Sequence, residues 1–214
     1  MTDTPIPTPR DAFELLMAGN RRFVANTPGH PNQDATRRSE VATGQRPFAV
    51  LFGCSDSRLA AEIIFDRGLG DLFVVRTAGH VMGAEVLGSV EYGVDILDCP
   101  LVVVLGHDSC GAVGAACAAL DDGMAATGYV QDIVERVTLS VLAARTAGRV
   151  EAEEILAEHI GRTVDLLLER SRSLAEKVAA GEAAVVGLHY RLADGSARLV
   201  AARGLDETVV AAAL

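Results

Sequence analysis

Short apolar runs rich in valine alternate with segments of helical character in the first half of the chain, and this alternation constrains the fold most. The runs lie at Phe48 to Gly53, Asp71 to Arg76 and Leu101 to Gly106. Helices are predicted between them, at Ala60 to Arg67 and Ala84 to Leu97. Apolar strands joined by helices are typical of a parallel sheet that is buried on both faces and connected by right-handed crossovers. We therefore predict an α/β fold with a mostly parallel central sheet flanked by helices.

The second half of the chain predicts further helices and two late strands. The elements are a helix from Gly111, a long helical region that continues to about Ala180 with a break near Gly148, and strands at Ala183 to Tyr190 and Arg198 to Ala202. The dipeptide Asp194-Gly195 between these strands is typical of a hairpin turn. The sheet is therefore expected to contain about four parallel strands plus an antiparallel edge strand.

The amino-terminal region is predicted to form an arm on the domain. Apolar residues between Pro9 and Val24 recur at roughly helical spacing, which predicts an amphipathic docking helix. The segment Asn26 to Arg46 is rich in Pro, Gly, Asn, Gln and charged residues, so it is interpreted as a long surface connection. A length of 214 residues is normal for one α/β domain. We expect a single domain over residues 1–214, in which residues 1–46 form the helix and loop arm.

Composition and charge exclude several functional classes. The chain is 50% hydrophobic but only 4% aromatic, without Trp, so its core must consist mainly of Ala, Val, Leu and Ile. A formal net charge of -10 argues against a nucleic-acid partner. No stretch approaches the roughly 20 apolar residues that span a bilayer, and Met1 to Pro9 lacks the pattern of a signal peptide. We expect a cytoplasmic protein with no membrane partner.

Two short segments that contain cysteine follow the first and third predicted strands. The first, CSDSR, spans Cys54 to Arg58, and the second, HDSCG, spans His107 to Gly111. The carboxyl ends of strands in an open α/β sheet form a ligand-binding crevice, so the two segments can converge. Two thiolates and one imidazole make a zinc ligand set that leaves the fourth tetrahedral position for water or an acid residue. This open position predicts a catalytic zinc site.

Simpler interpretations compete for the same residues. A single cysteine is more often a small buried apolar residue, and Cys99 and Cys117 are interpreted in this way. A disulfide between Cys54 and Cys110 is disfavoured by the expected cytoplasmic setting. A surface ion pair of one aspartate and one arginine is common and contributes about 0 to 1 kcal/mol. The joint spacing of the two segments favours the metal site over these alternatives.

From Gln45 to about Gly114 the sequence resembles the β-class carbonic anhydrases, with the CSDSR and HDSCG segments as the specific motifs. The resemblance implies one Zn²⁺ per subunit, with the ligands Cys54, His107 and Cys110. It also implies that Asp56 and Arg58 form a catalytic dyad that keeps the fourth zinc position for water. Asp56 is the alternative fourth ligand.

The same resemblance implies a set of substrate-binding residues. Gln45 would contact the substrate, Phe73 and Tyr92 would line the pocket, and the backbone N–H of Gly111 would help to orient the substrate. One segment departs from the family: after FVVR the family usually continues Asn-x-Ala-Asn, whereas this chain has Thr77 to His80 with the sequence TAGH. The histidine of this segment is a candidate proton shuttle.

The function implied by the resemblance is the reversible hydration of carbon dioxide to bicarbonate and a proton, by attack of zinc-bound hydroxide. Two other functions remain open from the residues alone. One is a hydrolase of carbon disulfide or carbonyl sulfide on the same fold, and the other is a non-catalytic zinc or bicarbonate-binding protein in which Asp56 closes the tetrahedron. The resemblance further implies a homodimer or homotetramer, and the amphipathic arm helix, which needs an apolar surface to cover, supports it.

Overall fold

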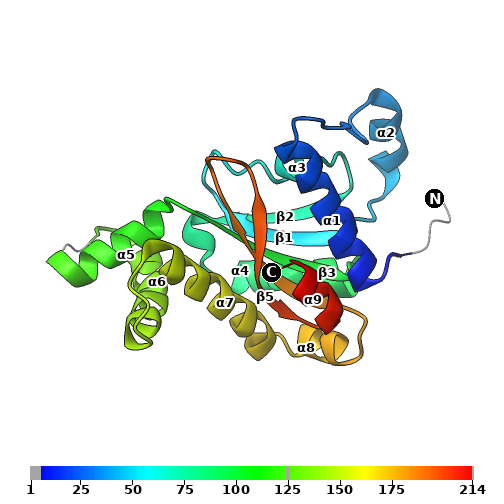
Figure 1. Cartoon of the computed structure of the whole chain (residues 1–214). Helices are drawn as coiled ribbons and strands as arrows, with labels where there is room; N and C mark the ends of the chain where they lie inside the picture. Colours follow the sequence, from blue (N-terminus) through cyan, green and yellow to red (C-terminus); the bar gives the residue numbers. More distant parts are fainter. Residues whose placement is uncertain (1–5, 124–125, 214) are drawn as a thin grey trace.

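The structure is a computed structural model that describes residues 6–123 and 126–213, and Figure 1 shows its arrangement. The strands are β1 (Ala49–Cys54), β2 (Leu72–Thr77), β3 (Leu101–His107), β4 (Ala184–Tyr190) and β5 (Ala197–Arg203). The longer helices are α1 (Pro9–Val24), α4 (Ala84–Glu91), α5 (Gly111–Asp122), α6 (Tyr129–Thr146), α7 (Ala152–Arg170) and α8 (Arg172–Ala179). The shorter ones are α2 (Ala35–Glu40), η1 (Val41–Thr43), α3 (Ala61–Ile64), η2 (Ala78–His80), η3 (Tyr92–Ile96) and α9 (Glu207–Ala213).

The sheet confirms the predicted fold class. Its strand order is β2-β1-β3-β4-β5, in which the first four strands run parallel and β5 pairs antiparallel with β4. Every residue of β1, β3 and β4 is buried, and successive side chains of a strand point to opposite faces, so both faces of the sheet centre are covered. Strand β2 forms one edge and is only partly buried.

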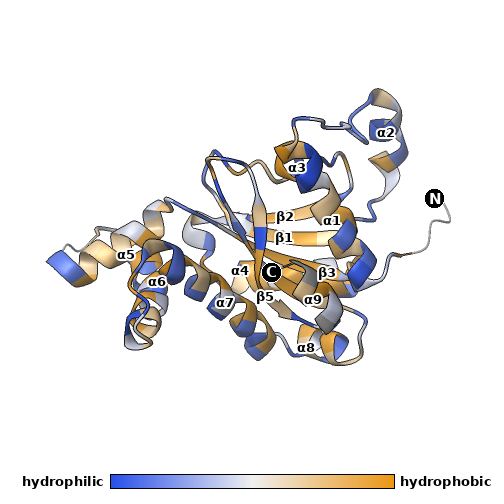
Figure 2. Cartoon of the chain, viewed as in Figure 1, coloured by the Kyte–Doolittle hydropathy of each residue, from blue (hydrophilic) through white to orange (hydrophobic). Residues whose placement is uncertain are grey.

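Helices pack along the sheet, and the central strands β1 and β3 consist mainly of hydrophobic residues (Figure 2). Helix α7 contacts β3, β4 and β5, whereas α4 contacts β1 and β2. Helices α5 and α6 pack against each other and extend away from the sheet beyond the carboxyl end of β3 (Figure 1). Within the described ranges, no helix is both long enough and apolar enough to cross a membrane.

The connection between α1 and β1 differs from the expected loop, because it contains α2 and η1. The side chain of Asp34 caps α2 by accepting a hydrogen bond from the backbone N–H of Arg37, at 2.7 Å. None of the residues of α2 is buried. The helix therefore has no apolar face, and a search for hydrophobic periodicity misses it.

The predicted helix 60–67 is shorter in the structure. It forms only α3, which ends before Asp66, a residue with a φ of 45°.

Helix α1 forms as predicted and docks on its own chain. The side chain of Thr8 caps it by accepting from the backbone N–H of Asp11, at 3.1 Å. The amide of the buried Asn20 donates to the carbonyl oxygens of Ile64 and Gly195, and its oxygen accepts from the N–H of Ala197. The buried residues of the apolar face, which include Phe13 and Leu16, belong to the core of the same chain. Helix α1 is thus not by itself an argument for a partner subunit.

Replacing Gly19 by Ala is expected to destabilise the protein by about 3 kcal/mol or more, because the helix backbone there touches the chain beneath it. A Cβ atom on Gly19 would lie 1.8 Å from the carbonyl oxygen of Phe65. Gly88→Ala is the matched control, since a Cβ at that helical position meets nothing within 4 Å and Ala favours helix by up to ~1 kcal/mol. Urea unfolding of both variants measures the difference. Equal midpoints for the two variants would show that α1 does not dock in this way.

A buried carboxylate ties the arm to the domain. Asp66 is 2% exposed and accepts hydrogen bonds from the backbone N–H groups of Gly29 and His30, both at 2.9 Å. The guanidinium of Arg22 donates to the same carboxylate at 2.6 Å. Burial raises the pKa of Asp66, but the Gly29 N–H, Arg22 and the His30 N–H together lower it further than burial raises it. The ionised form of Asp66 therefore stabilises the folded chain.

Asp66→Asn is expected to lower the free energy of unfolding near neutral pH by about 2 kcal/mol, since it removes a paired, buried charge. A carboxyl whose folded pKa is lowered stabilises the protein above its unfolded pKa of about 3.9, and this stabilisation is lost as the pH falls through the folded pKa. The difference between wild type and variant should thus be constant from neutral to mildly acidic pH and shrink only in stronger acid. Thermal unfolding against pH measures it, and a variant as stable as wild type at neutral pH would contradict it.

Candidate metal centre

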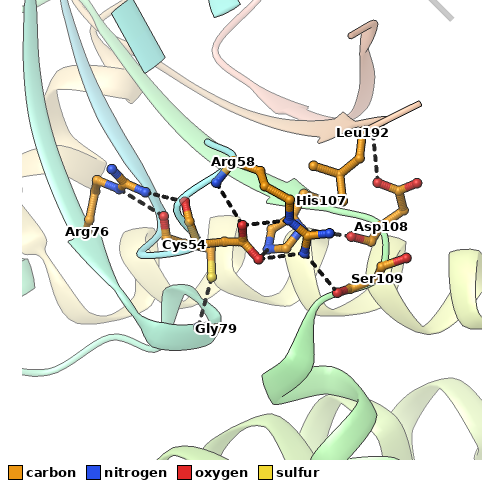
Figure 3. A network of polar contacts seen from close by, with 9 residues as sticks. Cys54, Arg58, Arg76, Gly79, His107, Asp108, Ser109 and Leu192 are labelled. Carbon is orange, nitrogen blue, oxygen red and sulfur yellow. Dashed lines mark hydrogen bonds and ion pairs between the residues drawn. The ribbon is translucent and has the colours of Figure 1, made fainter. Parts of the chain in front are cut away.

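The two cysteine segments meet at the carboxyl edge of the sheet. Cys54 is the last residue of β1, His107 is the last residue of β3, and Cys110 directly precedes α5. The two sulfur atoms and a ring nitrogen of His107 all lie within 4.8 Å of one another, and all three residues are buried. Figure 3 shows two of these three residues, Cys54 and His107, with the polar groups around them. The predicted convergence of the two segments is therefore observed.

The hydrogen bonds of His107 leave one ring nitrogen for a metal. Its Nδ1 lies 2.8 Å from the carbonyl oxygen of Asp108, an arrangement in which Nδ1–H donates and Nε2 keeps its lone pair. Nε2 is buried and has no hydrogen-bond partner in the part of the chain that the structure describes. A buried nitrogen without a partner costs free energy, and a cation between it and two sulfur atoms removes this cost. The Cys, His, Cys donor set fits Zn²⁺.

The two thiols differ in their affinity for a proton. The contact with Cys110 lowers the pKa of Cys54 to about 3, against the opposing effect of burial. The same contact, together with burial, raises the pKa of Cys110. Cys110 also stands at the amino end of α5, where the helix dipole favours a thiolate. Zinc binding by both sulfur atoms therefore releases protons and is favoured as the pH rises.

Asp56 and Arg58 lie beside the ligand set and pair with each other. The Arg58 guanidinium donates from Nε to Oδ1 at 2.9 Å and from Nη2 to Oδ2 at 2.7 Å, and its backbone N–H also donates to Oδ1 (Figure 3). These hydrogen bonds hold the pKa of Asp56 well below its usual range. Asp56 Oδ2 is 3.9 Å from His107 Nε2. The carboxylate is thus within reach of the metal position while both of its oxygen atoms are occupied by Arg58.

Arg76 supports the first ligand segment and is not among the site residues predicted from the sequence. Its Nε donates to the carbonyl oxygen of Cys54 at 2.9 Å, and its Nη2 donates to that of Asp56 at 2.6 Å (Figure 3). Arg76 stands on β2 in register with Gly53 of β1. An arginine near the carboxyl end of the neighbouring strand is the signal that could have identified it. These bonds fix the backbone on which Cys54 and Asp56 are held.

Gly79 supports the same ligand from η2. Its backbone N–H donates to the sulfur of Cys54 at 3.3 Å. Its φ is 62°, and a Cβ atom there would lie 2.6 Å from the Cβ of Ala112 on α5. Both the backbone conformation and the lack of space require glycine. The TAGH segment, which departs from the family pattern, thus places an N–H group on a metal ligand.

The structure does not support the candidate proton shuttle. His80 is 1% exposed, and its ring packs against that of His159 with centroids 4.3 Å apart. Burial keeps its pKa well below the usual value. A shuttle must gain and lose a proton near the working pH, whereas burial keeps this imidazole neutral. His159 is a hydrogen-bonded structural histidine, because its ring nitrogens contact the hydroxyl of Ser140 and the carbonyl oxygen of Gly79.

Three of the substrate residues named from the resemblance lie away from the ligands of the same chain. Phe73 is in register with Val50 and stacks on Tyr92, with ring centroids 5.9 Å apart. Val50 is four residues before Cys54, a separation of about 13 Å along a strand. Gln45 is exposed and precedes the opposite end of β1. Only Gly111, which follows Cys110, lies at the metal centre.

Comparison with known proteins agrees with this geometry. The family model described as carbonic anhydrase matches residues 49–197. The chain is 54% identical over 195 residues to carbonic anhydrase 2 of Mycobacterium tuberculosis (strain CDC 1551 / Oshkosh), covering 91% of this chain and 94% of the relative. It is also similar to the β-carbonic anhydrase of Coccomyxa in complex with acetazolamide (TM-score 0.71, 22% identity, 92% of this chain and 90% of that chain). A further likeness is to the two tetrameric β-carbonic anhydrases of Sordaria macrospora (TM-score 0.68, 21% identity, 87% and 95%).

The fold and the Cys-His-Cys centre define a zinc protein with the β-carbonic anhydrase architecture. The chain belongs to the carbonic anhydrase family.

Proposed function

We propose that the protein catalyses the reversible hydration of carbon dioxide to bicarbonate and a proton, with one zinc ion held by Cys54, His107 and Cys110. The observation that carries this proposal is the convergence of three buried ligand atoms within 4.8 Å, one of which is a nitrogen without a hydrogen-bond partner among the described residues. Zinc supplies Lewis acidity that makes hydroxide available from water near neutral pH.

The residues around the ligands would orient and protect the reaction. Asp56, held by Arg58, remains an ionised hydrogen-bond acceptor beside the ligand set. Arg76 and Gly79 keep Cys54 in place from two sides. The backbone N–H of Gly111, at the start of α5, is proposed to help orient the substrate, because helix amino ends favour negatively charged groups.

The other two functions are less well supported. The curated relatives are named carbonic anhydrases, which favours carbon dioxide over sulfur-containing substrates. A non-catalytic protein closed by Asp56 would require this carboxylate to face the metal position, whereas both of its oxygen atoms bind Arg58. The open arrangement supports a catalytic site.

Stopped-flow hydration of carbon dioxide by zinc-loaded protein tests the proposal, and we expect activity to rise towards alkaline pH. Two thiolates offset the charge of the ion, so water at the site stays less acidic than beside three neutral histidines, where its pKa is about 7. The half-maximal rate should therefore lie above pH ~7. A profile that is flat from mildly acidic to alkaline pH would contradict the electrostatic argument, and no turnover with zinc bound would contradict the function.

We also propose a homo-oligomer, a dimer or tetramer, in which Phe73 and Tyr92 of one copy approach the metal centre of another, together with Gln45. Strand β2 is a partly exposed sheet edge, and Tyr92 and Ile96 beside it are 47% and 64% exposed. Such an apolar edge favours burial against a second copy, and the related Sordaria proteins are tetrameric. Light scattering tests this, and an active monomer would contradict it.

The setting is proposed to be the cytoplasm, with the whole chain acting as one domain. None of the four cysteines forms a disulfide, which is typical of proteins in reducing compartments. Fractionation of the native host is the measurement that tests this location.

A further inference from the structure

A small cavity lies between η2, α6 and α7. Its volume is about 80 Å³, and its lining combines apolar side chains with polar and basic ones, namely His80, Arg136, Ser140, His159, Arg162, Thr163 and Arg170. A water molecule needs about 10 to 15 Å³ of such space, so the cavity has room for several waters or for one small polyatomic ion.

The charge of the lining is one-sided. Three arginines face the cavity, and none of the residues that line it is acidic within the described ranges. Arg136 donates to the carbonyl oxygen of Met82 at 3.0 Å, which uses only one of its donors. In the part of the chain that the structure describes, none of the three arginines forms an ion pair. A group of cations without counter-ions is unexpected in a chain of net charge -10, and it favours binding of an anion.

His80 is the second, independent sign of a ligand. Its side chain is 99% buried, it lines the cavity, and neither of its ring nitrogens has a hydrogen-bond partner among the described residues. A neutral imidazole carries one N–H donor, and leaving it unpaired in the interior costs free energy. The neighbouring polar groups do not satisfy it, because Ser140 bonds to His159 and Thr163 bonds to the carbonyl oxygen of His159.

From these features we propose that the cavity binds one small inorganic oxyanion of the phosphate, sulfate or bicarbonate type. Guanidinium groups match the oxygen atoms of such ions with paired donors, and His80 supplies a further N–H. The site is separate from the zinc ligands, but it adjoins them: the backbone N–H of Gly79, next to His80, donates to Cys54. An ion in the cavity would thus contact the segment that holds a metal ligand.

Isothermal titration calorimetry of zinc-loaded protein with inorganic phosphate tests this site. Chloride keeps the ionic strength the same in every titration. Wild type should bind one phosphate per chain, and Arg162→Gln should weaken this binding at least about tenfold, because a charge-assisted hydrogen bond is lost. Arg136→Gln should act in the same direction. Arg38→Gln is the matched control, since it removes the same charge from the exposed surface of α2 and should leave the affinity unchanged.

Three outcomes would overturn the proposal. If the wild-type protein binds no phosphate, the cavity is not an anion site. Phosphate binding that is equally strong in wild type, Arg162→Gln and Arg136→Gln would place the ion elsewhere, for example at the zinc. Arginine variants that change the oligomeric state in light scattering without changing phosphate binding would assign the arginines to an interface between copies. Circular dichroism of each variant confirms that it is folded, and none of these measurements depends on turnover.

Discussion

Cys54→Ser is expected to lose zinc and carbon dioxide hydration together, whereas Cys117→Ser should keep both. Cys54 supplies a thiolate ligand at the end of β1, and its contacts already lower its pKa to about 3. A serine hydroxyl stays protonated near neutral pH and is a poor zinc ligand. Changes to outer-shell groups alone cost about 10- to 100-fold in metal affinity, so loss of a direct ligand should reduce activity to background.

Zinc content by mass spectrometry of metals and stopped-flow hydration measure the two effects. Cys117 is the matched control because it is a partly exposed cysteine on α5 outside the ligand set, and its substitution makes the same change of sulfur to oxygen. Excess chelator should convert wild type to the behaviour of Cys54→Ser, and added zinc should restore it. Full zinc occupancy and normal turnover in Cys54→Ser would remove Cys54 from the metal centre.

The sheet and the ligand set could be predicted from sequence because both depend on local patterns. Valine-rich runs such as Leu101 to Gly106 are buried at every position, and their order alone places Cys54 and His107 at one edge. The helix α2 could not be predicted in this way. Its six residues bury nothing, so only the cap at Asp34 marks it.

The residues that hold the zinc ligands in place were harder to predict than the ligands themselves. Arg76 acts through backbone carbonyl groups, and this role depends on the register of β2 against β1, which no spacing in the sequence fixes. The position of Phe73 relative to Cys54 also depends on this register. A resemblance names the residues of a site but does not say which copy of the chain supplies each of them. Within one chain, Phe73 and Tyr92 lie apart from the zinc ligands.

Arg58→Ala is expected to keep one zinc per chain but to lower kcat/KM at least about 100-fold, because it frees Asp56. In wild type the guanidinium occupies both oxygen atoms of Asp56, and the carboxylate lies 3.9 Å from His107 Nε2. A carboxylate without this partner is drawn to a cation and can take its fourth ligand position. Arg58→Lys should also lose most activity, since an ammonium group cannot reproduce the paired geometry.

Cobalt substitution separates this explanation from a general loss of structure. The visible absorption of cobalt-loaded wild type should change with pH as water exchanges at the fourth position, and that of Arg58→Ala should not, because Asp56 fills it. Adding Asp56→Ala to Arg58→Ala removes the competing ligand, so the double variant should regain the pH-dependent spectrum even where turnover stays low. If Arg58→Ala instead hydrates carbon dioxide at the wild-type rate, or if the double variant keeps the pH-independent spectrum, Arg58 does not act by restraining Asp56.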